Sequence, residues 1–160
     1  MNKASTKAAI LLRDVQGIDL RIFFEHQSDP HATAMAAFPA RDRENFNAHW
    51  KKIIADPAVA IQSILSGKHV AGYVGSFIRE EKREVCYWLG REFWSKGIAS
   101  QALKSFLRQD KHRPLFARVL KENKASLRVL EKCGFSIESE ETFKNKEGRE
   151  EEEYLLILLT

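Results

Sequence analysis

The stretch of sequence that decides the fold is YWLGREFWSKGIASQALKSF, residues 87–106. An extended, aromatic-rich run at 85–89 leads into a short loop that contains Gly97. After this loop, apolar residues recur at the spacing of one helix face, at Ala99, Leu103, Phe106 and Leu107. A glycine-bearing loop between a strand and a helix start directs free backbone N–H groups and the positive helix end at one point. The stretch therefore predicts an anion site, and the ligand it suggests is a phosphate group.

Size and composition indicate one soluble domain, residues 1–160. A chain of 160 residues buries roughly 68–70% of its unfolded surface, and a content of 44% hydrophobic and 30% charged residues is ordinary for a globular protein. The two cysteines, Cys86 and Cys133, lack a CxxC spacing, so they indicate neither a disulfide framework nor a metal site and fit a reducing compartment. Charges at Arg13 and Asp14 interrupt the first apolar stretch, and no apolar run reaches membrane-spanning length. We expect a cytoplasmic protein without membrane contact.

The charges are unevenly distributed. Residues 91–132 hold eleven Lys or Arg against four acids, whereas residues 136–153 hold eight Glu against three bases. The basic block surrounds the predicted anion loop, as a site for a polyanionic ligand requires. Two alternatives stay open: the block forms solvated helix faces, or it binds RNA. An aromatic-bearing sheet motif typical of RNA-binding modules is absent, so we expect no nucleic acid partner.

The remaining sequence alternates between strand and helix patterns. Predicted strands are 7–13, 59–65, 69–79, 83–89, 115–120, 135–143 and 152–159, and predicted helices are 19–29, 42–54, 98–109 and 124–133. The first helix is expected to end at Asp29-Pro30 because the residue before proline disfavours helical backbone. This order predicts an α/β (α+β) domain with a mixed, mostly antiparallel sheet of about seven strands flanked by about four helices.

Neither common phosphate-binding motif is present. The chain lacks GxxxxGK[ST], and the glycines Gly72 and Gly75 lie inside a predicted strand rather than in a GxGxxG turn. Instead, WSKGIA at 94–99 resembles the acetyl-CoA pyrophosphate loop, [Q/R]-x-x-G-x-[G/A], of the GNAT superfamily of N-acetyltransferases. The aromatic Trp94 in place of Gln or Arg resembles the branch of ribosomal-protein N-terminal acetyltransferases, which commonly reads YWLxxxxWGKGxAxEA.

A second motif lies downstream at the expected separation. NKASLRVLEKCGF, residues 123–135, resembles the family signature N-x-x-S-x-x-x-x-E-K-x-G-F at every marked position. Upstream, EVCYW at 84–88 is similar to the family's E-[IL]-G-Y-W, with Cys86 in place of glycine. The first helix and its HQSDP end at 26–30 also resemble this branch, and together these motifs span about two thirds of the chain.

The resemblance implies a GNAT-like fold with a V-shaped splay between the fourth and fifth strands, here those at 83–89 and 115–120. It implies acetyl-CoA as the co-substrate, with no metal. Because Gly97 has no Cβ, a pyrophosphate can approach its backbone closely. A simple turn from a strand into a helix would also explain a glycine at this position. The cofactor-binding residues that the resemblance implies are Leu89, Trp94, Ser95, Lys96, Gly97, Ile98, Ala99, Asn123 and Ser126.

The implied chemistry is direct transfer of the acetyl group to an amine, without a covalent enzyme intermediate. The resemblance places the Ser126 hydroxyl near the thioester sulfur, where it could protonate the leaving thiolate, while Asn123 and Ser126 would equally serve a helix cap. Glu84 is the preferred general base, with a structural surface role and a water relay as alternatives. Weaker base candidates are His49, His69, Glu138 and Glu140. Tyr87 and Trp88 are interpreted as packing residues.

The acceptor is the least determined part. The resemblance implies a peptide or protein N-terminus or a small amine, and the acidic runs at 138–141 and 150–153 either attract such a cation or form a solvated hairpin edge. A homodimer is compatible with the sequence. A CoA-binding domain of the same fold without turnover is the alternative to an enzyme.

Overall fold

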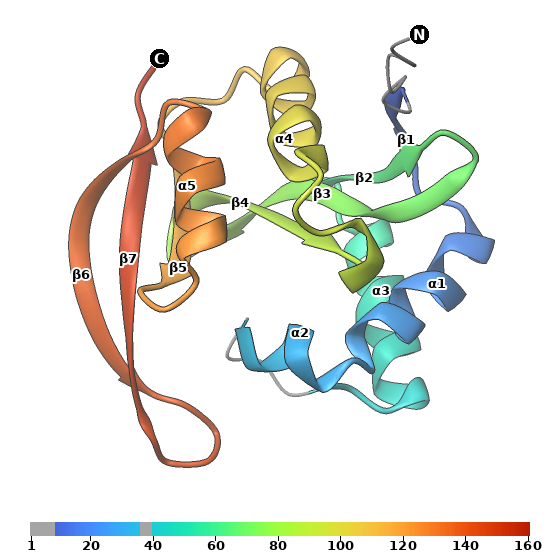
Figure 1. Cartoon of the computed structure of the whole chain (residues 1–160), viewed down its shortest axis with the longest axis horizontal. Coiled ribbons are helices and arrows are strands. Elements are labelled where there is room, and N and C mark those ends of the chain that lie inside the picture. Colours follow the sequence, from blue (N-terminus) through green and yellow to red (C-terminus); the bar gives the residue numbers. More distant parts are fainter. Residues whose placement is uncertain (1–8, 36–39) are drawn as a thin grey trace, which may run out of the picture.

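The fold is built on one mixed sheet. The computed structural model describes residues 9–35 and 40–160, and in this part its seven strands take the order β1-β2-β3-β4-β5-β7-β6 (Figure 1). The strands are β1 (Ile10–Asp14), β2 (Ala60–Ser66), β3 (His69–Arg79), β4 (Lys82–Leu89), β5 (Leu115–Leu120), β6 (Ser136–Lys144) and β7 (Glu150–Leu158). The helices are α1 (Gly17–Gln27), α2 (Pro30–Met35), α3 (Arg43–Ala55), α4 (Ile98–Gln109) and α5 (Lys124–Lys132), with a 3-10 turn η1 (Arg91–Phe93). The predicted mixed, mostly antiparallel seven-stranded sheet is confirmed.

Two features differ from the prediction. The described residues form five helices rather than about four, because α2 begins directly where the first helix was expected to end. Proline is favoured at the first position of a helix, and the Asp29 carbonyl accepts the N–H groups of Ala32 and Thr33 at 3.1 and 3.2 Å. The pair Asp29-Pro30 therefore both ends α1 and starts α2. The first strand begins at Ile10, and residues 7 and 8 of its predicted range lie outside the described part.

Hydrophobic clusters cover both faces of the sheet. Val74 packs in the cluster beneath α4 and α5, whereas Tyr73 packs against Phe23 and Trp50 of α1 and α3. Since successive side chains of a strand point to opposite faces, the two clusters lie on opposite sides of β3. The sheet is therefore the middle layer, with α4 and α5 on one face and α1 and α3 on the other.

The strands β4 and β5 separate along their length. They are the parallel pair of this sheet, and their register holds at one position, Glu84 opposite Phe116. β4 continues to Leu89 without a further pair to β5, so the two strands diverge toward their C-terminal ends. This confirms the predicted V-shaped splay between the fourth and fifth strands. The site described below lies in that opening.

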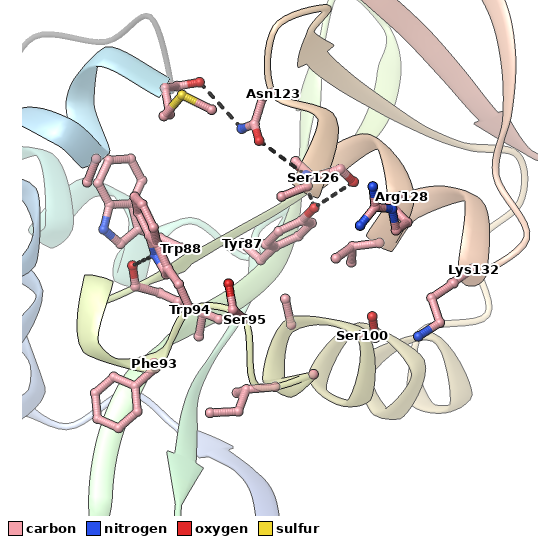
Figure 2. A pocket seen from close by; sticks show the side chains of 18 residues that line it. Tyr87, Trp88, Phe93, Trp94, Ser95, Ser100, Asn123, Ser126, Arg128 and Lys132 are labelled. Atoms are coloured by element: carbon pink, nitrogen blue, oxygen red, sulfur yellow. Dashed lines mark hydrogen bonds between the residues drawn. The ribbon is translucent and has the colours of Figure 1, made fainter.

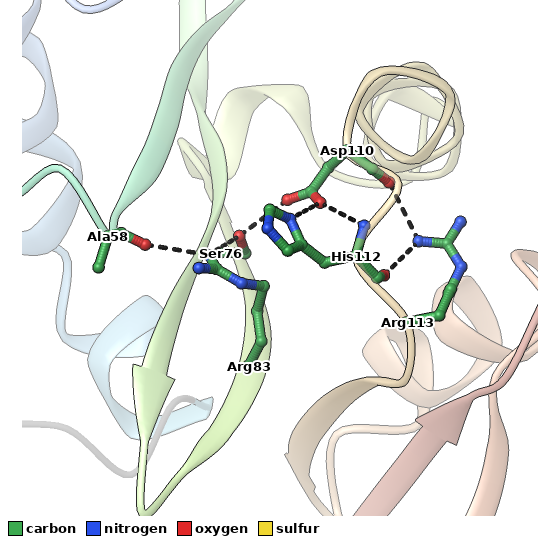
Figure 3. A network of polar contacts seen from close by, with 6 residues as sticks. All are labelled: Ala58, Ser76, Arg83, Asp110, His112 and Arg113. Atoms are coloured by element: carbon green, nitrogen blue, oxygen red, sulfur yellow. Dashed lines mark hydrogen bonds and ion pairs between the residues drawn. The ribbon is translucent and has the colours of Figure 1, made fainter.

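A network of polar side chains surrounds the C-terminal end of α4 (Figure 3). Asp110, the residue after α4, is buried and accepts a hydrogen bond from the Ser76 hydroxyl of β3 at 3.0 Å. Its other oxygen contacts His112 Nδ1 at 2.6 Å, and Arg83 of β4 donates to the Ser76 hydroxyl at 3.0 Å. Burial acts to raise the pKa of Asp110, but its hydrogen bonds with His112 and Ser76 hold that pKa below its usual range. The network connects the C-terminal end of α4 to β3 and β4.

Two observations concern membrane-spanning helices and metal-binding side chains. Among the residues that the structure describes, no helix combines the length and the apolar character needed to cross a bilayer. Within the same residues, no three His, Cys, Asp or Glu side chains are grouped so that they could hold a metal ion.

Candidate active site

A cleft of about 510 Å³ opens where β4 and β5 diverge (Figure 2). Its walls come from the end of β4, the loop before α4, the first turn of α4, one face of α5 and the short helix α2. Eight of the predicted site residues line it: Leu89, Trp94, Ser95, Gly97, Ile98, Ala99, Asn123 and Ser126. Lys96 and Glu84 are not part of its lining.

The loop before α4 has the geometry of an anion cradle. Gly97 is the N-cap of α4 with φ +75°, and Ser95 also has a positive φ of +62°. A Cβ added to Gly97 would meet no atom within 4 Å, so the space beside this backbone is open. The N–H groups of the first helical turn have no partner within the helix and point out of its N-terminus. The residues present therefore fit a phosphate group approaching the backbone at Gly97.

The cations at the cleft come from α5 rather than from the loop. Arg128 and Lys132 lie four residues apart on one face of α5 and line the cleft, while the Lys96 side chain is exposed and does not. The sequence placed all three in the basic block but could not tell which of them face the ligand. The α5 pair supplies positive charge to the wall of the cleft that α5 forms (Figure 2).

The edge of β4 presents backbone groups to the gap. Gly90 donates its N–H to the Ala71 carbonyl at 2.9 Å, and the register places Gly72 opposite Leu89. Backbone groups in an antiparallel pair alternate between facing the neighbouring strand and facing away from it. The N–H and C=O of Leu89 therefore point away from β3, into the opening toward β5.

The Trp94 side chain forms a hydrogen bond with the carbonyl group of Leu89. Its indole Nε1 donates to the Leu89 oxygen at 3.0 Å (Figure 2). The contact fixes how the last residue of β4 is oriented beside the loop. The predicted cofactor-binding residue Trp94 thus also acts on the backbone of Leu89.

Tyr87 is a site residue that the sequence reasoning missed. It was interpreted as packing, but its hydroxyl lies 2.5 Å from the Ser126 hydroxyl and 3.2 Å from the Ser126 carbonyl oxygen. Burial raises the pKa of Tyr87 to about 12, although the hydrogen bond with Ser126 acts in the opposite direction. The strand alternation offered a signal, because Tyr87 is two residues before Leu89 and therefore shares its face of the sheet.

Asn123 joins two walls of the cleft. Its side-chain oxygen accepts the Ser126 N–H at 3.1 Å and caps α5, which confirms the capping interpretation. Its side-chain nitrogen donates to the Met35 carbonyl at the end of α2, at 3.4 Å. The cap holds the Ser126 side chain toward Tyr87, and the second bond brings α2 over the cleft.

Glu84 lies in a different environment from the one expected. Its carboxylate is 2% exposed and pairs with Arg118 at 3.3 Å. Arg118 also contacts Glu141 of β6 at 2.6 Å and Glu153 of β7 at 3.2 Å. Glu84 sits where β4 and β5 still pair, at the closed end of the splay. Its position therefore does not support the predicted role of general base and indicates a structural one.

The weaker base candidates also lie outside the cleft lining. Glu140 pairs with Lys121 at 2.9 Å on the outer hairpin, and the exposed His69 starts β3. His49 lines a separate small hollow beside Trp88. Burial raises the pKa of the Cys86 thiol to about 12, so this thiol stays protonated at neutral pH.

Comparisons with known proteins agree with this geometry. The sequence profile described as "Acetyltransferase (GNAT) domain" matches residues 9–136. No curated protein sequence gives a significant match.

Several solved structures share the fold across nearly the whole chain. The spermidine N-acetyltransferase from Vibrio cholerae in complex with CoA and spermine has a TM-score of 0.83 at 19% identity, covering 94% of this chain and 95% of that one. The microcin C7 self-immunity acetyltransferase MccE in complex with acetyl-CoA and AMP has a TM-score of 0.79 at 16% identity, with 94% and 92% covered. A GNAT-family acetyltransferase from Bacillus anthracis has a TM-score of 0.75 at 22% identity, with 96% of each chain covered. At these identities the likeness concerns the fold alone.

Proposed function

Since the chain belongs to the GNAT acetyltransferase family, we propose that it is an N-acetyltransferase that moves the acetyl group of acetyl-CoA to a primary amine. The observation that carries this proposal is the cleft between β4 and β5, which has the open Gly97 loop at one side and the Leu89 backbone at the other. Two of the similar structures were obtained with CoA or acetyl-CoA, which supports the same co-substrate here.

The cofactor position follows from the backbone. The diphosphate of acetyl-CoA would accept hydrogen bonds from the loop at 95–99, with Arg128 and Lys132 beside it. The amide-containing arm would lie beside the end of β4, as an added strand lies at a sheet edge. The acetyl group then reaches the end of β4.

Bond formation at the thioester requires stabilisation of a developing oxyanion. The amine nitrogen attacks the carbonyl carbon, and negative charge builds on the carbonyl oxygen. The Leu89 N–H points into the gap and is the donor we assign to this oxygen. Removing one such donor typically lowers the rate by about 100- to 1,000-fold.

The departing thiolate requires a proton. We assign this step to the Tyr87 and Ser126 pair, whose hydroxyls meet at the cleft wall. Because burial raises the pKa of Tyr87 to about 12, its phenol stays protonated at neutral pH and can donate. The carbon–sulfur bond breaks, the sulfur takes this proton, and the enzyme recovers it from water. Since Glu84 lies outside the cleft, the proton of the attacking amine leaves through water.

For the acetyl acceptor we propose a chemical class, primary amines, rather than one compound. The resemblance of residues 87–99 to ribosomal-protein N-terminal acetyltransferases favours a peptide N-terminus. The spermidine acetylated by the Vibrio cholerae relative favours a small amine. Both supply a primary amine, which loses a proton to water so that its nitrogen can attack the same thioester.

A thiol-release assay with mass spectrometry tests the proposal. The protein would be mixed with acetyl-CoA and a panel of small amines and short peptides with free N-termini. We expect at least one amine to be acetylated with one CoA thiol released per product. Thiol release no faster than hydrolysis without protein, for every acceptor, would instead favour a CoA-binding domain without turnover.

A further inference from the structure

A second, smaller hollow lies on the face of the sheet opposite α4 and α5. It is walled by aromatic side chains of α1, α3 and β3, and Trp88 of β4 lines both this hollow and the cleft. The register places Tyr73 directly opposite Trp88, so the two rings share this face of the sheet. The hollow and the cleft thus border the same side chain, that of the residue before Leu89.

The size of the hollow limits what it can hold. Its volume is about 30 Å³. Because one water needs about 10–15 Å³ of such volume, there is room for about two water-sized groups. Two oxygens of a carboxylate fill this space, whereas a sugar ring or a nucleotide base does not fit.

The polar groups of the hollow are matched to an anion. Arg41, His49, Gln27 and Tyr73 are its polar lining residues, and none of the described residues that line it is acidic. Burial, followed by the charges of Arg41 and Lys52, lowers the pKa of His49, so its ring is neutral at pH 7 and can donate one N–H. Burial raises the pKa of Tyr73, which keeps its phenol as a donor.

Arg41 is held in place through its backbone. Gln27, buried at the end of α1, donates from Nε2 to the Arg41 carbonyl at 2.8 Å and accepts the Arg41 N–H on Oε1 at 2.9 Å. This paired contact joins two segments fourteen residues apart in the sequence. It fixes the point from which the guanidinium side chain starts.

We propose that this hollow binds a carboxylate of the acetyl acceptor, so that the preferred acceptors are amino compounds that also carry an acidic group. This inference rests on the proposed function, because it concerns the acceptor of the same reaction. The Arg41 guanidinium would repel a polycation such as spermidine, which places this chain's acceptor in a different chemical class from that of the Vibrio cholerae relative.

Matched acceptor pairs test the inference. The panel consists of L-amino acids, β-alanine and γ-aminobutyrate, each with its primary amide, together with spermidine. For wild-type protein we expect kcat/KM to favour the best carboxylate over its amide by about 10- to 100-fold, the effect of one charge-assisted hydrogen bond. In Arg41→Gln this ratio should fall to about one, while the Kd for acetyl-CoA stays unchanged.

Arg43→Gln is the matched control. Arg43 lies two residues away, over the Phe24 ring at 4.2 Å, and does not line the hollow. It should keep the wild-type ratio. Equal use of acids and amides by the wild type, or a carboxylate preference that survives Arg41→Gln, would overturn the inference.

A binding measurement separates this inference from the proposed function. If no acceptor is turned over, the proposed function fails, but N-acetyl amino acids and their amides can still be titrated into the protein with CoA by calorimetry. Tighter binding of the carboxylate form to wild type than to Arg41→Gln would support the hollow as an acid site. Equal or absent binding of both forms would reject it.

Discussion

Replacing Gly97 by alanine tests the anion loop with the smallest available change. Gly97 has φ +75°, and an added Cβ meets no atom within 4 Å. Gly148, in the turn between β6 and β7, has φ +80° and equally open surroundings. The two substitutions therefore introduce the same left-handed strain, but only Gly97 lines the cleft.

The two effects have different expected sizes. A non-glycine residue in left-handed backbone costs about 1–2 kcal/mol, and for a chain of this length that lowers Tm by roughly 2–8 °C in both variants. At Gly97 the methyl group also occupies the space through which a phosphate would approach the backbone. Losing one charge-assisted hydrogen bond of about 1.5–3 kcal/mol weakens CoA binding by about 10- to 100-fold.

The assay is calorimetric titration of CoA into each variant, with thermal unfolding measured in parallel without ligand. We expect similar Tm losses for Gly97→Ala and Gly148→Ala, and weaker CoA binding for Gly97→Ala alone. Wild-type affinity in Gly97→Ala would show that the diphosphate does not lie against this loop. A similar affinity loss in Gly148→Ala would attribute the effect to strain.

Three further predictions concern chemistry and stability. Tyr87→Phe should lower kcat by about 10- to 1,000-fold with little change in the Kd of acetyl-CoA. Because the pKa of Tyr87 is raised to about 12, the wild-type rate should show no loss between about pH 8 and pH 10. An alkaline decline centred in that range would exclude this tyrosine as the acid. Trp94→Phe removes the indole donor to the Leu89 carbonyl and should lower kcat more than it raises KM, whereas a change in KM alone would limit Trp94 to cofactor binding. Asp19→Asn breaks the ion pair between the fully buried Asp19 carboxylate and the partly exposed Arg13, and should destabilise the fold by about 2–4 kcal/mol at pH 7, measured by urea unfolding. Since the pKa of Asp19 is lowered in the fold, its contribution is complete above about pH 4 and is lost as the pH falls further, so the variant and the wild type should converge in acid; a constant difference would contradict this assignment.

The backbone of the site could be predicted because its signals are local in the sequence. Gly97 sits between a strand pattern and a helix pattern, so the turn, the positive φ and the helix N-terminus all follow from one short stretch. The capping role of Asn123 is similarly local, since its partner is the Ser126 N–H three residues later. The mixed, mostly antiparallel sheet follows from the alternation of elements, and the splay is what the family resemblance implies.

Side-chain partners from distant segments could not be predicted in the same way. Tyr87 and Ser126 are 39 residues apart, and their contact depends on how α5 packs beside β4. Glu84 matches a motif position, but Arg118 is 34 residues away and removes its carboxylate from the cleft by pairing with it. Strand alternation could have placed Tyr87 on the cleft side, whereas no local pattern marks Arg118 as the partner of Glu84.

A crystal structure of the protein with acetyl-CoA tests the central claim most directly. We predict diphosphate oxygens within about 3 Å of backbone nitrogens in the loop at 95–99, and the thioester oxygen at the same distance from the Leu89 N–H. Electron density for the coenzyme outside the opening between β4 and β5, or a thioester pointing away from Leu89, would contradict the account.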